Sequence, residues 1–213
     1  ELAQKNEEIE ALQAQINPHF LYNTLDSVNW MLIARGEMDI SAVVVALGKL
    51  MQYSMDTARA MVSLEEEYRN VRDYLMIQKN RLEDRLEFTL ELDETLKCFP
   101  VPKLILQPLV ENAIKYGIEP SLQPGHILVR TRKTDDDIQI LVKDNGCGMD
   151  EAQLTFYRRL LRNDLSGQTN IGVRNVARRL QLHFGGRCGF NVSSRPGGGL
   201  SITIRIPAQE EQS

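Results

Sequence analysis

The chain has 213 residues, with 25 Lys and Arg, 29 Asp and Glu and 42% hydrophobic residues, a composition typical of one large or two small folded domains. A charged fraction of 25% with apolar residues throughout excludes a mainly disordered chain. No run approaches the roughly 18 consecutive apolar residues that span a bilayer. Three cysteines without a CxxC pair, and three histidines, argue against a disulfide framework or a structural zinc site. The net charge of −4 argues against a general nucleic-acid binder, although Phe156 to Phe190 carries seven Arg against one Asp and suits contact with an anion.

The first 82 residues carry helical patterns. Apolar residues at alternating three- and four-residue spacing form a heptad seam at Leu2, Ile9, Leu12 and Ile16. Such a seam buries little unless another helix covers it, so we expect a parallel dimer. Pro18 lacks a backbone N–H, and the helix should kink there or restart with Pro18 in its first position. Helical spacing then resumes and stops near Gly36.

Two more helices follow before the pattern changes. One is expected from about residue 41 to 58. The next begins at Ser63, because Ser63 and Glu66 match a capping box, and runs to about residue 82. Residues 1–82 are therefore expected to form a helical hairpin that dimerises and, since the chain opens inside a helix without Met, we expect it to be part of a longer protein.

From about residue 86 the sequence alternates between strands and helices. Strands are expected at 86–92, 126–133 and 138–144, the last two joined by a turn at 135–137. Helices are expected from Pro102 to Gly117 and near 150–162 and 172–184. A hairpin around 196–199 closes the domain. This order predicts an α+β sandwich, a mixed sheet with helices on one face, over residues 83–208, followed by a tail at 209–213.

Four short segments in this half carry polar or glycine residues where a ligand could bind. Glu111 and Asn112 lie on a helix with an apolar inner face, where unpaired polar groups are costly, and an Asn carbonyl oxygen suits Mg²⁺ with bridging phosphates. A hydrogen-bonding role inside the fold is the alternative. Asp144 ends a strand and precedes Gly146 and Gly148, which let the backbone approach a ligand closely.

The other two segments lie further along the chain. Asn170-Ile171-Gly172 opens a helix inside the Arg-rich stretch, and a helix start after a tight turn offers backbone N–H groups to a phosphate. The run 197–199, with Gly198 at its centre, fits a phosphate contact or an ordinary hairpin turn. Each segment alone is also typical of ordinary turns and helix ends.

Their order is more specific than any one of them. ENAIKYG, DNGCG, NIGVRN and GGGLSITI, in this sequence and spacing, resemble the nucleotide-binding boxes of the GHKL-type ATPases (gyrase, the heat-shock 90 chaperones, MutL and histidine kinases) over residues 86–207. The resemblance implies ATP and Mg²⁺, with Asn112 as the metal ligand, Asp144 as the reader of adenine, and the glycines as lid hinges and phosphate contacts. It assigns to the nucleotide Asn112, Lys115, Tyr116, Asp144, Gly146, Gly148, Asn170, Gly172 and Gly198. Asn170 stands where the family usually has glycine.

The N-terminal segment indicates which group of GHKL-type proteins the chain resembles. The sequence NPHFLYN around His19, together with ILQPLVENAIKYGI and YLMIQKNRLEDRL, resembles two-component sensor histidine kinases of the LytS/YesM-like branch. The resemblance implies that His19 receives the phosphoryl group. Many relatives place an acidic residue directly after this histidine, whereas this chain has Phe20, so Glu111 is a candidate base. Asn23 lies one helical turn after His19, and the resemblance implies that it contributes to phosphatase activity on the partner.

The sequence therefore predicts a sensor histidine kinase that phosphorylates His19 from Mg-ATP and passes the phosphoryl group to an aspartate of a response regulator. We expect a homodimer that contacts a receiver domain and the upstream sensor and transmembrane region of the same protein, with no direct nucleic-acid contact. We also expect the chain to be a cytoplasmic fragment of a bacterial plasma-membrane protein. Two alternatives remain open: a GHKL ATPase that does not phosphorylate histidine, and a degenerate nucleotide-binding scaffold that dimerises.

Overall fold

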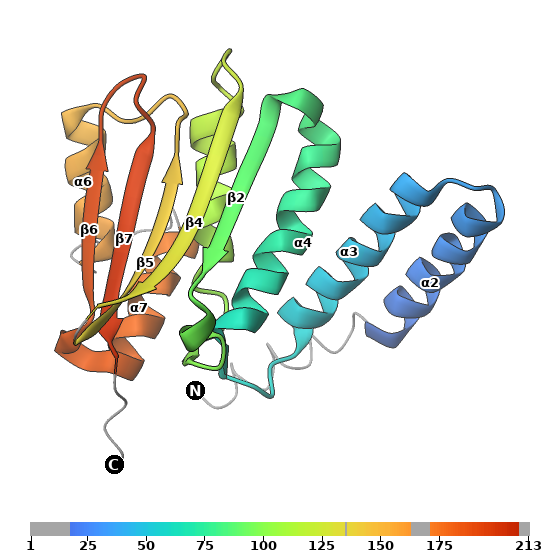
Figure 1. Cartoon of the computed structure of the whole chain (residues 1–213), viewed down its shortest axis with the longest axis horizontal. Coiled ribbons are helices and arrows are strands. Elements are labelled where there is room, and N and C mark those ends of the chain that lie inside the picture. The colour runs from blue at the N-terminus through green and yellow to red at the C-terminus, as the bar shows by residue number, and fades with distance from the viewer. Residues whose placement is uncertain (1–17, 135, 163–170, 209–213) are drawn as a thin grey trace, which may run out of the picture. The chain divides into compact units, whose positions relative to one another are not determined.

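The computed structural model describes residues 18–134, 136–162 and 171–208, and the chain divides into two compact units between Asp56 and Thr57 (Figure 1). The predicted heptad seam and the loop that contains Asn170 lie outside the described residues. Within them, no helix is long and apolar enough to cross a bilayer.

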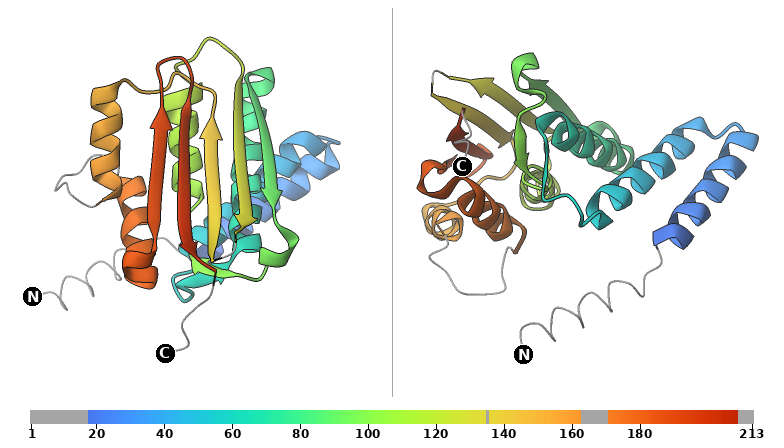
Figure 2. Two further views of the ribbon diagram at one scale, coloured as in Figure 1. Left: turned by 60° about the vertical axis from the view of Figure 1, so that its left-hand side comes forward. Right: turned by 90° about the horizontal axis from the view of Figure 1, so that it is seen from below.

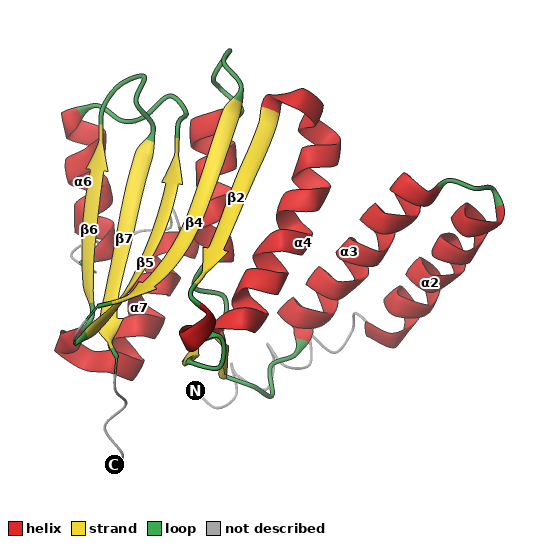
Figure 3. Cartoon of the chain, viewed as in Figure 1, coloured by secondary structure: helices red, strands yellow, loops and turns green. Residues whose placement is uncertain are grey.

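The first unit contains a helical hairpin, α2 (Pro18–Ala34) and α3 (Met38–Met55), joined by a short turn (Figure 3). Gly36 in the turn has φ of +78°, a conformation that glycine adopts readily, and this confirms the predicted stop of the first helix. Helix α3 begins and ends three residues earlier than the range 41–58 expected from the sequence. The Ser41 hydroxyl donates to Asn29 Oδ1 at 2.6 Å and ties the two helices together.

The second unit is built on a five-stranded mixed sheet in the order β2-β4-β5-β7-β6. Its strands are β2 (Leu86–Leu92), β4 (Gly125–Lys133), β5 (Asp137–Asp144), β6 (Gly189–Ser194) and β7 (Leu200–Pro207). Strands β2 and β4 are parallel and the other neighbours are antiparallel, which confirms the predicted mixed sheet and both hairpins. A separate two-stranded ladder, β1 (Met61–Ser63) with β3 (Pro100–Pro102), was not predicted.

Helices cover one face of this sheet, as predicted (Figure 2). They are α4 (Leu64–Leu82), α5 (Gln107–Asn112) with its π-helical continuation Ala113–Ile118, α6 (Glu151–Leu161) and α7 (Ile171–Phe184). Short 3₁₀ turns lie at Glu83–Arg85, Glu94–Leu96 and Gly185–Arg187. Along β5, Ile138, Ile140 and Val142 are buried under the helices, whereas Gln139 and Lys143 on the other face are exposed. The core therefore lies between one sheet face and one layer of helices.

Helix α4 belongs to the second unit, whereas the sequence placed the domain boundary after residue 82. Val71 and Leu75 are fully buried. The Tyr68 hydroxyl bonds to the Glu91 carbonyl at 3.1 Å and to Thr131 Oγ1 at 2.7 Å, on two strands of the sheet. Its packing on the sheet makes α4 part of the second core.

The helix expected to begin at Pro102 begins later, at Gln107, so this prediction is wrong. Pro102 lies in β3, opposite Met61. The next residues form a turn in which Leu104 has φ of +59°. The turn is held by the fully buried carboxylate of Glu67, which accepts bonds of 2.6 to 2.9 Å from the backbone N–H groups of Leu104, Ile105 and Leu106. This tertiary anchor, 37 residues away in the chain, delays the helix.

Candidate functional site

The second unit contains a cavity of about 580 Å³ between the π-helical segment, the end of β5, α6 and the start of β7. Its lining is mostly apolar, with a few polar side chains: Asn112, Tyr116, Gly117, Asp144, Gly148, Met149, Ala152, Gln153, Phe156, Tyr157 and Leu200. A cavity of this size and composition fits a small organic ligand that is oriented by a few hydrogen bonds.

Asp144 is the buried charged group of the cavity, with 2% of its surface exposed. Its Oδ1 accepts hydrogen bonds from the backbone N–H groups of Gly146 at 2.8 Å and Leu200 at 3.3 Å. Burial raises the pKa of the Asp144 carboxyl above its ordinary value, while these N–H donors oppose the shift. Since both bonds use Oδ1, the second oxygen, Oδ2, is the natural acceptor for a ligand's N–H group.

Glycines bring the surrounding backbone segments together. A Cβ on Gly146 would lie 2.2 Å from the carbonyl oxygen of Gly117, so only glycine permits this approach. A Cβ on Gly117 would lie 2.7 Å from Asp144 Oδ1. Gly148 has φ of +66°, and the Cβ it lacks would lie 2.0 Å from the Arg195 carbonyl oxygen. The structure thus gives Gly146 and Gly148 a packing role that holds the Asp144 carboxylate in place.

Asn112 lines the cavity where α5 passes into the π-helical segment. Its Nδ2 donates to the Pro108 carbonyl at 2.9 Å, which makes Oδ1 the atom suited to a cation. The Glu119 N–H bonds to the Ile114 carbonyl at 2.9 Å, the five-residue spacing of a π-helix. Because a π-helix has more residues per turn than an α-helix, Asn112 can line the cavity together with residues 116 and 117.

The neighbouring predicted residues lie at or beyond the rim. Tyr116 lines the cavity and is 49% exposed, and the Lys115 ammonium lies 5.2 Å from the centre of its ring. Glu111 is exposed on α5, accepts a hydrogen bond from Gln107 Nε2 at 2.7 Å, and does not line the cavity. Its role as a base stays a prediction.

Two predicted glycines lie outside the cavity lining. Gly172, in the first turn of α7, faces α5, where an added Cβ would lie 3.2 Å from Pro108 Cβ. Gly198 lies in the turn between β6 and β7, and its N–H bonds to the Arg195 carbonyl at 2.9 Å. Their phosphate contacts stay predictions, as does that of Asn170, which lies outside the described residues.

One side of the cavity was not predicted from the sequence. Residues along one face of α6 and the loop before it line it at helical spacing: Met149, Ala152, Gln153, Phe156 and Tyr157. Gly117 was interpreted only as a helix end. The three- and four-residue spacing directly after the DNGCG segment is the signal that could have revealed this wall.

The predicted phosphoacceptor lies on α2 in the first unit. His19 is exposed, and Asn23, one turn later, bonds to it with 3.2 Å between Asn23 Nδ2 and His19 Nδ1. The structure therefore brings these two predicted residues together.

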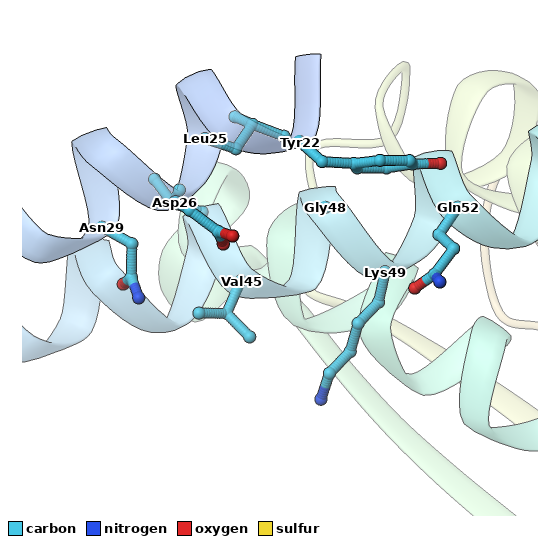
Figure 4. A pocket seen from close by; sticks show the side chains of 9 residues that line it. Tyr22, Leu25, Asp26, Asn29, Val45, Gly48, Lys49 and Gln52 are labelled. Atoms are coloured by element: carbon cyan, nitrogen blue, oxygen red, sulfur yellow. The ribbon is translucent and has the colours of Figure 1, made fainter. Parts of the chain in front are cut away.

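The same hairpin carries a shallow pocket of about 330 Å³ between α2 and α3 (Figure 4). Tyr22, Leu25 and Asp26 of α2 and Val45 and Lys49 of α3 contribute to its lining. Large apolar side chains are also exposed on the hairpin: Phe20, Val28, Trp30, Met31, Met38, Ile40, Val45 and Leu47. This many exposed large apolar side chains on two helices favours a contact with another protein that covers some of them.

Comparisons with known proteins also divide the chain into an N-terminal and a C-terminal part. Residues 7–86 match the family model described as histidine kinase, and residues 101–210 match that of the histidine kinase-, DNA gyrase B- and HSP90-like ATPases. The chain is 42% identical over 207 residues, 97% of its length, to the sensor histidine kinase YesM of Bacillus subtilis. The chain belongs to the histidine kinase family.

Other similarities support this kinase assignment and the fold. An uncharacterized sensor-like histidine kinase of Staphylococcus epidermidis is 32% identical over 94% of the chain. The chain spans about a third of the length of these relatives, 34% and 38%. The histidine kinase domain of the Erythrobacter litoralis EL346 blue-light activated kinase shares the fold, with a TM-score of 0.51 and 18% identity over 89% of this chain and 95% of that one.

Proposed function

We propose that this kinase chain transfers the γ-phosphoryl group of ATP to His19 and then to an aspartate of a response regulator. The observation that carries the proposal is the cavity around Asp144 in one unit, together with the exposed His19–Asn23 pair in the other. The first supplies a site for the phosphoryl donor, and the second supplies a nucleophile.

The cavity fits the base of ATP. Its apolar walls suit the faces of a purine ring. The exocyclic amine of adenine can donate a hydrogen bond to the Asp144 carboxylate. Asn112 and Tyr116 line the cavity and the Lys115 ammonium lies beside the Tyr116 ring, so we expect the phosphates of a bound nucleotide to extend toward these three side chains.

The residues present also fit Mg²⁺. Mg²⁺ in phosphoryl-transfer sites keeps several waters and takes one or two protein oxygens besides the phosphates. Asn112 Oδ1 is such an oxygen, and the described residues contain no cluster of three or more His, Cys, Asp or Glu side chains suited to a metal. Asn112 would hold the ion, whose charge stabilises the developing charge on the phosphoryl oxygens.

His19 acts as the nucleophile through an unprotonated ring nitrogen, because the lone pair of that nitrogen must attack the phosphoryl group. One ring nitrogen must carry the proton while the other attacks. Asn23 contacts Nδ1, and an amide rotated by 180° would place Oδ1 there to accept an Nδ1–H bond and make Nε2 the attacking atom. Asn23 thus takes the orienting role of the acidic residue that Phe20 replaces.

We infer the binding partners of this chain from its family. Histidine kinases work as dimers with response regulators, and the exposed apolar residues of the hairpin support a second copy of this chain as the occupant of that surface. An upstream sensor and transmembrane region of the same protein would control the approach of the nucleotide unit to His19 and would place this chain on the cytoplasmic side of the plasma membrane.

The test is incubation with γ-labelled ATP and Mg²⁺, comparing the wild-type chain with His19→Gln. The chain has two other histidines, so His126→Gln and His183→Gln are matched controls. We expect acid-labile, base-stable label in the wild type and both controls, and none in His19→Gln. ATP hydrolysis without label would support the ATPase alternative, ATP binding without turnover would support the scaffold, and label that persists in His19→Gln would identify a different acceptor.

A further inference from the structure

One buried polar group in the cavity has no partner among the described residues. Tyr157, on α6, is 3% exposed and lines the cavity, yet its hydroxyl makes no hydrogen bond there. Native proteins satisfy nearly all buried polar groups, because an unsatisfied group loses its bonds to water without compensation. A water molecule or a ligand could supply the bond that the described residues do not, and a ligand that did so would bind in the cavity that Tyr157 lines.

Tyr157 has Asp144 as its charged neighbour. Burial, and next the negative charge of Asp144, raise the pKa of the Tyr157 hydroxyl, which keeps it protonated and able to donate. The cavity therefore presents two complementary groups, an acceptor at Asp144 and a donor at Tyr157. Around them the walls are apolar, with contributions from Met149, Phe156 and Leu200. A ligand must match both groups to avoid leaving one of them unpaired.

Adenine carries the matching pattern. Its exocyclic amine donates, and the ring nitrogens that flank the amine, N1 and N7, both accept. Guanine presents a carbonyl oxygen in place of the amine and a protonated N1, so it would set an acceptor against the Asp144 carboxylate. A site built to pair with one polar pattern strongly rejects the analogue that leaves its buried groups unpaired.

We propose that the Tyr157 hydroxyl donates a hydrogen bond to a ring nitrogen beside the adenine amine and, with Asp144, makes the site selective for adenine over guanine. This inference rests on the proposed ATP site and adds a residue that reads the base.

The test measures dissociation constants by calorimetry for ATP, 1-deaza-ATP, 7-deaza-ATP and GTP, with the wild-type chain and Tyr157→Phe. The two deaza analogues each lack one of the candidate ring nitrogens. We expect Tyr157→Phe to weaken ATP binding by about 3- to 10-fold, the usual effect of one neutral hydrogen bond. One of the two deaza analogues lacks the nitrogen that Tyr157 contacts, and this analogue should bind to Tyr157→Phe as tightly as to the wild type. The preference of Tyr157→Phe for ATP over GTP should be smaller than that of the wild type.

The matched control is Tyr68→Phe. Tyr68 is equally buried but bonds to Glu91 and Thr131 outside the cavity, so its variant should lose thermal stability and keep nucleotide selectivity. Tyr157→Phe should instead unfold no earlier than the wild type without nucleotide, since it removes an unsatisfied hydroxyl.

Two results would overturn the inference: unchanged ATP affinity in Tyr157→Phe, or an equal loss for ATP and both deaza analogues, which indicates a structural role. A wild-type chain that binds no ATP would overturn the proposed function itself, and the two failures are distinguished by the wild-type measurement alone.

Discussion

Asp144 has a structural role in the fold and a proposed role in binding the base, and the substitution Asp144→Asn separates the two. The amide oxygen can still accept from the Gly146 and Leu200 N–H groups, so the fold should survive. The charged acceptor for the base amine is lost, however, and hydrogen bonds to charged groups contribute about 1.5–3 kcal/mol. We expect ATP affinity by calorimetry to fall about 10- to 100-fold, with no decrease in thermal midpoint at pH 7. A variant that binds ATP normally would contradict the assignment.

The same carboxylate predicts a pH dependence of stability. Burial raises the pKa of folded Asp144, so its favourable contribution to folding is fully present below its ordinary value of 3.8 and is lost as pH rises through the raised value. Asp144→Asn cannot ionise. Its free energy of unfolding should therefore increase relative to the wild type as pH rises from about 4 to 7. Urea denaturation across this range measures the difference, the exposed Asp84→Asn being the control. A difference that stays constant would argue against a raised pKa.

Asn23 contacts the ring of His19, the proposed phosphoacceptor, and this contact supports the predicted part of Asn23 in phosphatase activity. In Asn23→Ala the amide that orients the ring, or a water beside it, is gone. We expect dephosphorylation of the response regulator to slow on the order of 100-fold, as misplaced reacting groups usually do. Thr24→Ala is the control, since Thr24 lies next to Asn23 and its Oγ1 donates to the Phe20 carbonyl of its own helix. Normal dephosphorylation by Asn23→Ala would exclude the role.

At the scale of single elements, the start of α4 is fixed by its own sequence. Ser63 Oγ accepts from the Glu66 N–H at 3.2 Å, and the Glu66 carboxylate accepts from the Ser63 N–H at 3.0 Å. Ser63→Ala removes one of these bonds and should lower the free energy of unfolding by about 1 kcal/mol. Urea denaturation measures this change in the free energy of unfolding, and Ser193→Ala on the exposed side of β6 is the control. Equal effects of both substitutions would show that the cap contributes nothing.

Elements with local signals were predictable, and elements held by distant residues were not. The α4 cap, the five sheet strands and helices α6 and α7 follow from capping residues and periodicity. The start of α5 does not, because the turn before it is held by Glu67, whose position opposite that turn depends on the packing of α4. Hydrophobic periodicity in 102–117 is compatible with a helix, and only the tertiary contact makes its first residues a strand and a turn.

Only some residues of the candidate site were predictable from the sequence. Asn112, Tyr116, Asp144 and Gly148 line the cavity and were predicted, because the order of short motifs along the chain identified them. Tyr157 was not, because its significance lies in burial without a hydrogen-bond partner, a property of the packed structure. Motif order can therefore identify the loops that line the candidate site, whereas the side of the cavity formed by α6 depends on how that helix is packed.

For the whole molecule, the division between Asp56 and Thr57 predicts which part folds alone. We expect the fragment 57–213 to unfold cooperatively and to bind ATP as the full chain does, whereas the fragment 83–213 should not fold. The shorter fragment loses the buried side chains of α4, including Leu64, Val71 and Leu75, all at 0% exposure. Each contributes about 1.5–3 kcal/mol, so the three together contribute roughly 4.5–9 kcal/mol, which is comparable with the 5–15 kcal/mol by which domains are usually stable.

The decisive measurements on the two fragments are thermal unfolding by circular dichroism and ATP binding by calorimetry. Fragment 57–213 carrying Leu75→Ala is the matched intermediate, because a buried Leu→Ala substitution costs about 2–5 kcal/mol and should lower the unfolding midpoint without removing the transition. A folded, ATP-binding 83–213 would return the boundary to residue 82 and make α4 part of the hairpin. Loss of folding in 83–213 alone would instead mean that α4 is part of the nucleotide unit. Its bonds from Glu67 to the turn before α5 and from Tyr68 to the sheet would then be required for that unit to fold.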